Sequence, residues 1–336
     1  MSVRVGILGA TGYTAFELMR LLLRHNQVEI TALTTRSDDR PHVTDAHPAL
    51  SGCLDLSLEN LVLEEIVKRT DFVFSCLPHA ASAEVVAPLV DARKQVVDFS
   101  ADYRLNDTAV YTQWYGNEHP DPGRVGNTVY GLPELFRQQI HGQRLVANPG
   151  CYTSTSILAL APLLQEKLIA SNDIIIDAKS GVSGAGRTPK LNTLYCEANE
   201  SISAYGVGKH RHTPEIEQVL STVAGEPVHV IFTPHLVPMD RGILATIYAR
   251  PARQLSQDDV LSVLHGAYEG EPFVQVVDHL PATRHVAGTN NFHVTARIVR
   301  DRVMVIAALD NLLKGASGVA MQNFNLMCGF EETTGF

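Results

Sequence analysis

Cys151 stands where a reactive thiol would be expected. A short apolar run, residues 145–147, is broken by Pro149 and Gly150, and an apolar segment with helical spacing runs from Ile157 to Leu168. This order predicts a strand, a turn and a helix that begins near Cys151. Unpaired N–H groups at a helix N-terminus favour an anion and lower a thiol pKa, so a nucleophilic thiolate is one interpretation. The other is a small buried hydrophobe, which most free cysteines are.

A second set of candidate catalytic residues precedes another predicted helix. His210 and His212 come just before Thr213 and Pro214, which are typical of an N-cap and a first helical position. A defined helix start would hold His212, which titrates near neutral pH, and Glu215 one turn on would orient its ring. A His-x-His pair also suits a metal, but no further ligand stands at a supporting spacing, so we expect no metal. A solvated structural pair is the remaining alternative.

A glycine-rich turn lies between the first predicted strand and the first predicted helix. Residues 3–8 form the apolar strand, and Gly6, Gly9 and Gly12 recur every third residue, a variant of the dinucleotide-binding spacing. Such glycines let backbone N–H groups approach a pyrophosphate at a helix N-terminus. The predicted dinucleotide-binding residues are Gly9, Ala10, Thr11, Gly12 and Tyr13. A purely structural tight turn is the alternative.

The end of the second predicted strand bears on which dinucleotide binds. Residues 28–34 are followed closely by Arg36 and Ser37, where an NAD-binding domain usually has an acidic residue for the ribose 2′-hydroxyl. A cation and a hydroxyl suit a 2′-phosphate, so Arg36 and Ser37 predict NADP(H). Asp38 and Asp39 keep NAD open, and Arg36 as a solvated loop charge is a further alternative.

The order of strands and helices predicts two domains of different class. Over residues 1–150 strands alternate with helices, which predicts an α/β, Rossmann-type dinucleotide-binding domain with a parallel sheet. Over residues 151–311 strands follow one another at hairpin-like spacing. This predicts an α+β catalytic, substrate and oligomerisation domain with a mainly antiparallel sheet. A final helix over residues 312–336 has an apolar face that we expect to pack back on the first domain.

Two more segments carry residues suited to ligands. The loop of residues 180–187 is rich in glycine and serine and would either approach a nicotinamide closely or be flexible. Arg104 follows the predicted strand of residues 95–100. Its guanidinium would bind a carboxylate or phosphate, or else pair with Asp102 or Asp107 on the surface.

Length, charge and cysteine content exclude several classes. A chain of 336 residues predicts about two domains. A net charge of −9 with no basic block argues against nucleic acid as a partner. Five scattered cysteines without a C-x-x-C pair favour neither a disulfide framework nor a zinc site, and indicate the reducing cytoplasm. No window reaches the roughly 20 apolar residues of a membrane helix, so no membrane partner is expected.

These candidates together predict hydride transfer to a carbon held as a thioester. The Cys151 thiolate attacks an acyl carbon and expels a leaving group, and hydride from the dinucleotide reduces the thioester to a thiohemiacetal that collapses to an aldehyde. His212 would supply the acid and base. Backbone N–H groups near Cys151 would stabilise the oxyanion.

Five segments are more distinctive than the glycine turn alone. They are GATGYT at Gly9–Thr14, NPGCY at Asn148–Tyr152, SGVSGAGR at Ser180–Arg187, GKHRHTPEI at Gly208–Ile216 and DNLLKGA at Asp310–Ala316. Spread over nearly the whole chain, they resemble the N-acetyl-gamma-glutamyl-phosphate reductase family. That family belongs to arginine biosynthesis and is related to aspartate-semialdehyde dehydrogenase.

The resemblance implies a reaction and a set of roles. The reaction is the NADPH-dependent reductive dephosphorylation of N-acetyl-L-glutamyl 5-phosphate to N-acetyl-L-glutamate 5-semialdehyde, in the cytoplasm. Cys151 would be the nucleophile and His212 the general acid and base. The residues near the nicotinamide end would be Ser183, Gly184 and Asn311. Those that contact substrate or hold the base would be Arg104, Tyr205, His210 and Glu215.

Several alternatives stay open beside this one. A related reductase could act on aminoadipyl phosphate in lysine biosynthesis, or the chain could be an aspartate-semialdehyde dehydrogenase-like enzyme. A cysteine hydrolase with a vestigial dinucleotide fold and a non-catalytic NADP sensor are rivals from other classes. The expected partners are a small acyl phosphate and further copies of the chain, in a dimer or tetramer.

Overall fold

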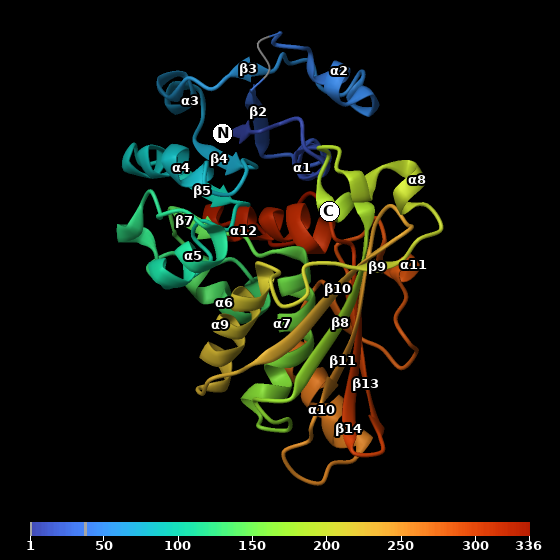
Figure 1. Cartoon of the computed structure of the whole chain (residues 1–336). Coiled ribbons are helices and arrows are strands. Elements are labelled where there is room, and N and C mark those ends of the chain that lie inside the picture. Colours follow the sequence, from blue (N-terminus) through green and yellow to red (C-terminus); the bar gives the residue numbers. More distant parts are fainter. Residues whose placement is uncertain (1, 37–38) are drawn as a thin grey trace. The chain divides into compact units, whose positions relative to one another are not determined.

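The computed structural model describes residues 2–36 and 39–336, so the predicted cofactor residue Ser37 lies outside the described residues. Two compact units make up the chain, and each contains one sheet (Figure 1). The first unit comprises Met1–Pro149 and Ala316–Phe336, and the second comprises Gly150–Gly315.

The first unit is built on a seven-stranded sheet whose described pairings are all parallel. In order across the sheet, the strands are β3 (Glu59–Asn60), β2 (Val28–Thr35), β1 (Val3–Leu8), β4 (Phe72–Ser75), β5 (Gln95–Asp98), β7 (Leu145–Ala147) and β6 (Val129–Tyr130). Every residue of β4 is buried, as expected for a parallel strand covered on both faces. The predicted Rossmann-type class of this unit is confirmed.

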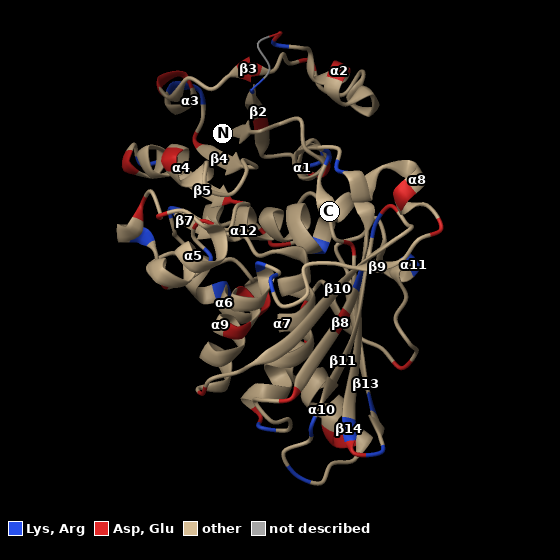
Figure 2. Ribbon diagram, viewed as in Figure 1, with Lys and Arg blue, Asp and Glu red and all other residues tan. Residues whose placement is uncertain are grey.

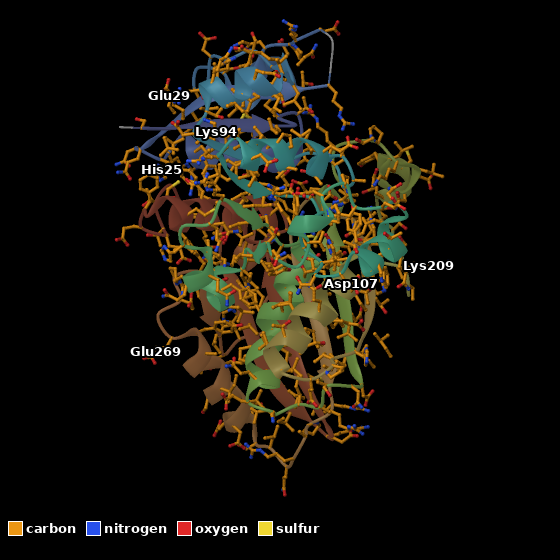
Figure 3. The ribbon with its side chains drawn as sticks, turned by 90° about the vertical axis from the view of Figure 1, so that its left-hand side faces the viewer. His25, Glu29, Lys94, Asp107, Lys209 and Glu269 are labelled. Carbon is orange, nitrogen blue, oxygen red and sulfur yellow. The ribbon has the colours of Figure 1, made fainter. Side chains whose placement is uncertain are left out.

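All but the last of the helices in the first unit lie between strands of this sheet in the sequence, and α12 follows the second unit. They are α1 (Tyr13–Leu22), α2 (Val43–Ala46), α3 (Leu63–Arg69), α4 (Ser82–Asp91), α5 (Thr108–Tyr115), α6 (Pro133–Ile140) and α12 (Gly318–Cys328), with short 3₁₀ turns at Pro48–Leu50 and Pro122–Arg124. Asp107, labelled in Figure 3, begins α5 because its carboxylate accepts a 2.7 Å hydrogen bond from the Ala109 N–H.

The last helix is shorter than the predicted span of residues 312–336. It occupies Gly318–Cys328, after a single π-helical turn at Leu313–Ser317. Gly329, at φ 75°, ends it, and the Phe330 N–H turns back to the Asn325 carbonyl at 2.8 Å. Within its own unit the helix contributes Phe324, whose ring meets that of Phe72 edge-on at 4.7 Å.

The second unit contains a mixed seven-stranded sheet. In order, its strands are β12 (Val274–Val276), β13 (Phe292–Val299), β14 (Arg302–Leu309), β11 (Ile243–Ala249), β8 (Ile174–Gly181), β10 (Val230–Val237) and β9 (Ser203–Ala204). Four of its six pairings are antiparallel and two, β8 with β10 and β12 with β13, are parallel. The predicted α+β class with a mainly antiparallel sheet is confirmed.

Alternation along these strands sets which face is covered. In β11 buried side chains alternate with half-buried ones, and α7, α9 and α10 pack against strands of this sheet. The helices of the unit are α7 (Cys151–Gln165), α8 (Tyr195–Ala198), α9 (His212–Ala224), α10 (Gln257–Tyr268) and α11 (Thr283–Val286), with 3₁₀ turns at Val182–Ala185 and Leu191–Thr193. In α7 every residue from Tyr152 to Leu164 is buried, so its sequence is apolar or small on all sides.

Charged residues of both signs are interspersed on both units, and the strands of the second sheet are mostly uncharged (Figure 2). Within residues 2–36 and 39–336, no helix combines the length and the apolar character that crossing a bilayer requires.

Candidate active site

Cys151 is the first residue of α7, as the sequence predicts. Gly150 precedes it as the N-cap with extended backbone, φ −79° and ψ 158°, and gives no side-chain cap. No acidic residue occupies the first turn of α7, and Cys151 itself is half-buried. The N–H groups of that turn therefore point toward the end of the helix where Cys151 lies.

Glu215 connects the start of α7 to α9. Its side chain is 1% exposed, and Oε1 accepts hydrogen bonds from the Gly150 N–H at 3.1 Å and the Thr153 hydroxyl at 2.9 Å. These contacts fix the backbone just before Cys151. The role predicted from the sequence, in which Glu215 orients the His212 ring, stays a prediction. Thr153 was not singled out from the sequence, although a hydroxyl two residues after the cysteine could have indicated a polar first turn.

Two tyrosines and a histidine surround the same end of α7. The Tyr205 hydroxyl donates to the Tyr152 hydroxyl at 3.1 Å, and the His210 ring meets both phenol rings edge-on at 5.5 and 5.6 Å. Burial raises the pKa of Tyr205 to about 12, and the pKa of Tyr152 is raised further by burial and by Tyr205. The charge of a Cys151 thiolate adds to both pKa shifts, so both phenols lie near the sulfur and stay protonated at neutral pH.

His210 and His212 are in contact, with ring centroids 4.8 Å apart. Burial, then the charge of Arg211, lowers the pKa of His210 to about 4, so His210 is neutral at pH 7. Its Nδ1 accepts the backbone N–H of His212 at 3.2 Å. Helix α9 begins at His212 rather than after Thr213, because His210 satisfies an N–H group that an N-cap side chain would otherwise serve.

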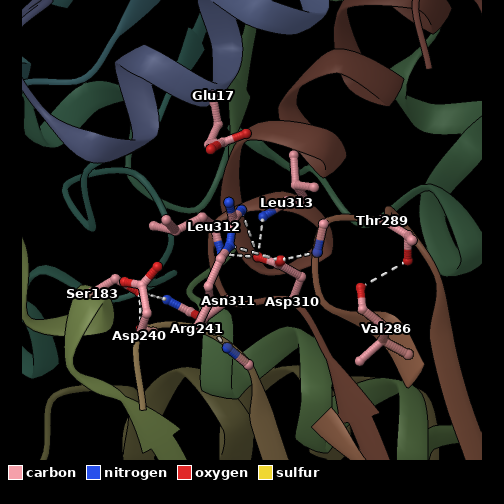
Figure 4. A network of polar contacts seen from close by, with 12 residues as sticks. Glu17, Ser183, Asp240, Arg241, Val286, Thr289, Asp310, Asn311, Leu312 and Leu313 are labelled. Carbon is pink, nitrogen blue, oxygen red and sulfur yellow. Dashed lines mark hydrogen bonds and ion pairs between the residues drawn. The ribbon is translucent and has the colours of Figure 1, made fainter. Parts of the chain in front are cut away.

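The predicted nicotinamide residues lie together in the second unit (Figure 4). The Asn311 side-chain amide donates to the Ser183 hydroxyl at 3.0 Å and accepts the Gly242 N–H at 2.6 Å. Ser183 in turn donates to the Asp240 carbonyl at 2.6 Å. A Cβ on Gly184 would lie 2.9 Å from the Ser180 hydroxyl, so this loop packs too closely for a side chain there. The loop of residues 180–187 is therefore held by a polar network.

Asp310, the residue before Asn311, forms a second set of polar contacts beside that network. Its fully buried carboxylate pairs with the Arg241 guanidinium at 2.9 Å and accepts the N–H groups of Gly288, Leu312 and Leu313 at 2.6, 2.9 and 3.1 Å. A buried charge with this many partners holds its surroundings in one arrangement. Asp310 belongs to the DNLLKGA segment, but the sequence analysis assigned it no role. No motif around Arg241 indicated a functional residue there.

Gly315 fits against Cys151. A Cβ on Gly315 would lie 2.8 Å from the Cβ of Cys151, closer than real carbon atoms approach. The Gly315 N–H donates to the Asp310 carbonyl at 2.9 Å. This hydrogen bond spans five residues, as is typical of a π-helical turn. Only a glycine therefore lets the DNLLKGA segment lie along the nucleophile.

In the first unit, the glycine turn has the form that a dinucleotide needs. Gly9 has φ +74°, and a Cβ there would lie 2.8 Å from the Cys76 carbonyl oxygen. Gly12 is the N-cap of α1, with no side-chain cap and no acidic residue in the first turn. The first N–H groups of α1 are thus open to an anion, which fits a pyrophosphate.

The other cofactor residues predicted in this unit follow β2 and the turn. Thr34 holds the turn, since it receives the Gly9 N–H on its hydroxyl at 3.2 Å and the Ala10 N–H on its carbonyl at 2.8 Å. Tyr13 is 38% exposed, and Arg36 is exposed directly after β2. Arg36 is thus available at the strand end where a ribose 2′-substituent binds in such folds.

Arg104 is buried, 5% exposed, rather than paired at the surface. Its guanidinium donates to the carbonyl of Asn148 at 2.7 Å and to that of Phe99 at 2.6 Å. Asn148 is held in turn by the Asn323 amide at 3.1 Å. These contacts fix the chain at the ends of β5 and β7, directly before Pro149.

Comparison with protein families gives two matches that together cover most of the chain. The model of the semialdehyde dehydrogenase NAD binding domain matches residues 4–143, and that of the semialdehyde dehydrogenase dimerisation domain matches residues 151–311. An N-acetyl-gamma-glutamyl-phosphate reductase from Rhodopirellula baltica is 51% identical over 99% of this chain and 98% of its own. One from Desulforudis audaxviator is 50% identical over 99% and 97%.

The chain belongs to the N-acetyl-gamma-glutamyl-phosphate reductase family. The resemblance drawn from the five segments is confirmed. Among solved structures, aspartate semialdehyde dehydrogenase II from Vibrio cholerae has a TM-score of 0.73 at 17% identity, over 97% of this chain and 98% of that one. The Candida albicans enzyme solved with NADP has a TM-score of 0.65 at 16% identity, over 97% and 98%. At such identities the likeness shows the fold alone.

In this member of the N-acetyl-gamma-glutamyl-phosphate reductase family, the predicted residues fall into three groups. Around the start of α7 are Cys151, Tyr205, His210, His212 and Glu215. Around the 180–187 loop are Ser183, Gly184 and Asn311. The residues in the first unit are Gly9, Ala10, Thr11, Gly12, Tyr13, Arg36 and Arg104.

Proposed function

We propose that the chain catalyses the NADPH-dependent reductive dephosphorylation of N-acetyl-L-glutamyl 5-phosphate to N-acetyl-L-glutamate 5-semialdehyde, in arginine biosynthesis. The observation that carries the mechanism is Cys151 at the uncapped start of α7, with its backbone fixed by Glu215 and its surroundings lined by Tyr152, Tyr205 and His210. Membership in the family supports the substrate.

Cys151 begins the reaction as a thiolate. Its Sγ attacks the acyl carbon of the substrate, the bond to the phosphate oxygen breaks, and inorganic phosphate leaves with the bonding electron pair. The N–H groups of the first turn of α7 are the proposed donors that stabilise the negative charge of the tetrahedral intermediate. Glu215 and Gly315 act here by position, because they fix the backbone before Cys151 and the space beside it.

His212 moves the protons. The backbone N–H of His212 donates to His210, and the His212 ring meets the Tyr152 ring edge-on with centroids 6.0 Å apart. Tyr152 is the residue next to Cys151, so these contacts position His212 relative to the nucleophile. His212 takes the proton of the Cys151 thiol, which forms the thiolate, and passes that proton to the phosphate that leaves. When the thiohemiacetal oxyanion collapses, the C=O bond of the aldehyde forms, and Sγ departs as a thiolate with the electron pair of the C–S bond. We propose that Glu215, on α9, supports Cys151 and His212 in these roles.

Tyr205 and His210 are the proposed substrate contacts of the second unit. Both are neutral at pH 7, so they offer hydrogen bonds rather than charge to an acyl phosphate. Because His210 Nδ1 accepts the His212 N–H, its Nε2 carries the proton and is a donor. Arg104 is proposed to contribute a positive charge as well as to hold the Asn148 carbonyl.

The cofactor residues fit NADP(H). Gly9, Gly12 and the uncapped start of α1 would hold the pyrophosphate, and Arg36 would pair with the 2′-phosphate. Ser183, Gly184 and Asn311 form the ordered segment proposed for the nicotinamide end. When bound, NADPH supplies the hydride that reduces the thioester.

We also propose that the enzyme is a cytoplasmic homodimer. All five cysteines are free thiols, which suits a reducing compartment. One face of the second unit's sheet carries half-exposed apolar side chains, among them Leu244, Tyr248, Met304 and Ile306. A second copy of this sheet is the partner that such a face fits, in agreement with the dimerisation domain model over residues 151–311.

The reverse reaction tests the proposed function. Purified chain should reduce NADP⁺ only when N-acetylglutamate semialdehyde and inorganic phosphate are both present, because the thioester needs phosphate to leave as acyl phosphate. Reduction without phosphate, or equal kcat/KM on aspartate semialdehyde or aminoadipate semialdehyde, would overturn it.

Substitution of the nucleophile tests the thioester. Cys151→Ser and Cys151→Ala should lower kcat by about three orders of magnitude or more, with NADPH binding unchanged. Cys196→Ser, an exposed cysteine of the same unit, should keep the wild-type rate. Wild-type turnover in Cys151→Ala would refute the covalent route.

A further inference from the structure

Three histidines outside the proposed active site come together in the second unit. His279 lies in the loop after β12, His285 is on α11, and His293 is on β13. One ring nitrogen from each lies within 4.8 Å of the corresponding nitrogens of the other two. Ring centroids are 5.1 Å apart for His279 and His285, 5.9 Å for His279 and His293, and 6.3 Å for His285 and His293.

His293 is the buried member of this cluster. It is 8% exposed, and its Nδ1 is enclosed with no hydrogen-bond partner among the described residues. A buried, unsatisfied ring nitrogen is costly and therefore calls for a partner.

The segment that carries the other two histidines is fixed to the sheet at both ends. The Val277 N–H donates to the Val294 carbonyl at 2.9 Å, and the Arg297 guanidinium donates to the Asp278 carbonyl, directly before His279. At the far end the Gly288 N–H donates to Asp310 at 2.6 Å, just after α11 (Figure 4). The backbone of the segment is thus fixed at both ends, and the rings of His279 and His285 are exposed.

Three imidazole side chains define the ligand class. They suit Zn²⁺ and its neighbours Co²⁺, Ni²⁺ and Cu²⁺, and three protein ligands plus one water is a common zinc arrangement. Bonds of about 2.0–2.1 Å in a tetrahedron place ligand nitrogens about 3.4 Å apart. The two exposed rings reach this by rotating, at the expense of a long 3.3 Å hydrogen bond from the Ala282 N–H to His285 Nδ1.

We propose that His279, His285 and His293 bind one zinc-class divalent ion, which fastens the segment of residues 277–288 to β13. The site is independent of the proposed reaction, because none of these residues belongs to the site around Cys151. Its function is structural: the same segment ends at Gly288, whose N–H donates to the Asp310 carboxylate, and the Asp310 carbonyl accepts the Gly315 N–H. The metal-free expectation drawn from the sequence considered the pair His210 and His212.

Metal titration of the chain without an added histidine tag tests the proposal. After chelator treatment, the protein should bind one Zn²⁺ per chain by calorimetry, and Co²⁺ should give the visible absorption of a tetrahedral site. His279→Ala and His285→Ala each remove an exposed ligand and should weaken binding at least about tenfold. Zn²⁺ should raise the Tm of wild type and leave that of the double variant unchanged.

Two control variants locate the binding. His265→Ala removes an exposed histidine of α10 and should bind as wild type does. Cys151→Ser removes the thiol as a rival ligand and should also retain binding. The proposal is overturned if wild type shows no saturable binding, if His279→Ala and His285→Ala bind with wild-type affinity, or if binding is lost only with Cys151 or His212.

Discussion

At the residue scale, Glu215 shows how one buried carboxylate can fix the backbone that carries a cysteine. It fixes the Gly150 N–H and the Thr153 hydroxyl, and so sets where the first turn of α7 begins. Hydrogen bonds to a charged acceptor contribute about 1.5–3 kcal/mol, roughly twice those of a neutral amide. The charge of Glu215, and not only its shape, therefore positions Cys151.

Glu215→Gln should accordingly lower kcat by about ten- to a hundredfold while KM for NADP⁺ stays the same. The free energy of unfolding should fall by about 1–2 kcal/mol, because the amide keeps an acceptor but loses the charge. Steady-state kinetics and urea unfolding measure the two effects. Glu217→Gln is the matched control on α9: its carboxylate accepts the Val230 N–H at 3.0 Å, so it should change stability and not kcat. Equal loss of kcat in both variants would mean that the helix, and not Glu215, is responsible.

His210 makes a separate prediction about pH. Its pKa is about 4 in the folded chain and about 6.5 in the unfolded chain, so between these values only the unfolded chain binds the proton. The free energy of unfolding should thus be highest above pH 6.5. As the pH drops toward 4, it should fall by on the order of 2 kcal/mol. His210→Gln should flatten this dependence in urea unfolding at pH 4.5 and 7.5. His265→Gln, at an exposed site, should leave it as in wild type, and an NMR titration that finds His210 protonated at pH 6 would refute the prediction.

At the scale of elements, the sequence predicted most segments but missed how their ends are made. Helix α9 begins at His212 and not after Thr213, since the ring of His210 does what a capping hydroxyl would do. The last helix stops at Cys328 because Gly329 turns the chain back, and a π-helical turn replaces its expected start. Local propensity sees residue types at fixed spacing, whereas these ends depend on contacts made in the fold.

The contacts that build the site lie beyond local pattern for the same reason. The sequence could place Cys151 at a helix start, because strand, turn and apolar period are all local there. It could not show that Glu215 would reach Gly150 or that Gly315 would lie against Cys151, since these residues are distant in the chain. The motifs that contain these residues could be found in the sequence, but the contacts that each side chain makes could not.

The close approach of the π-helical turn to α7 is testable with one methyl group. Gly315→Ala places a Cβ 2.8 Å from that of Cys151, so either the turn or the nucleophile must shift. We expect a loss of about 1–3 kcal/mol in unfolding free energy and a larger proportional loss of kcat than of NADPH affinity. Gly266→Ala in α10, where nothing lies within 4 Å of the added atom, should be neutral or stabilising. Wild-type kcat in Gly315→Ala would show that this contact does not position the thiol.

At the scale of the whole molecule, the two units divide the work that the reaction needs. The first unit provides the N-terminus of α1 for the proposed pyrophosphate, and the second provides the N-terminus of α7, which carries Cys151. In both, N–H groups at a helix N-terminus would stabilise an anion, the pyrophosphate in one and the thiolate in the other. The second unit also has to present one face of its sheet to something other than its own helices. Ile175, Tyr248 and Met304 are among its half-exposed side chains there, beside an ion pair of Lys179 with Asp177 at 2.7 Å.

In the proposed homodimer, a second copy would cover this face and bury the half-exposed apolar side chains of β11 and β14. A glutamate in the centre of such an interface would be buried without a partner, which destabilises the dimer strongly. Ile306→Glu should therefore shift the chain from dimer to monomer by light scattering at micromolar concentration, with the far-ultraviolet circular dichroism unchanged. Val299→Glu, at an exposed position at the end of β13, is the control that should stay dimeric. A wild-type chain that scatters as a monomer, or an Ile306→Glu variant that stays a dimer, would place the interface elsewhere, because a buried carboxylate facing its own copy across a two-fold axis cannot be accommodated there.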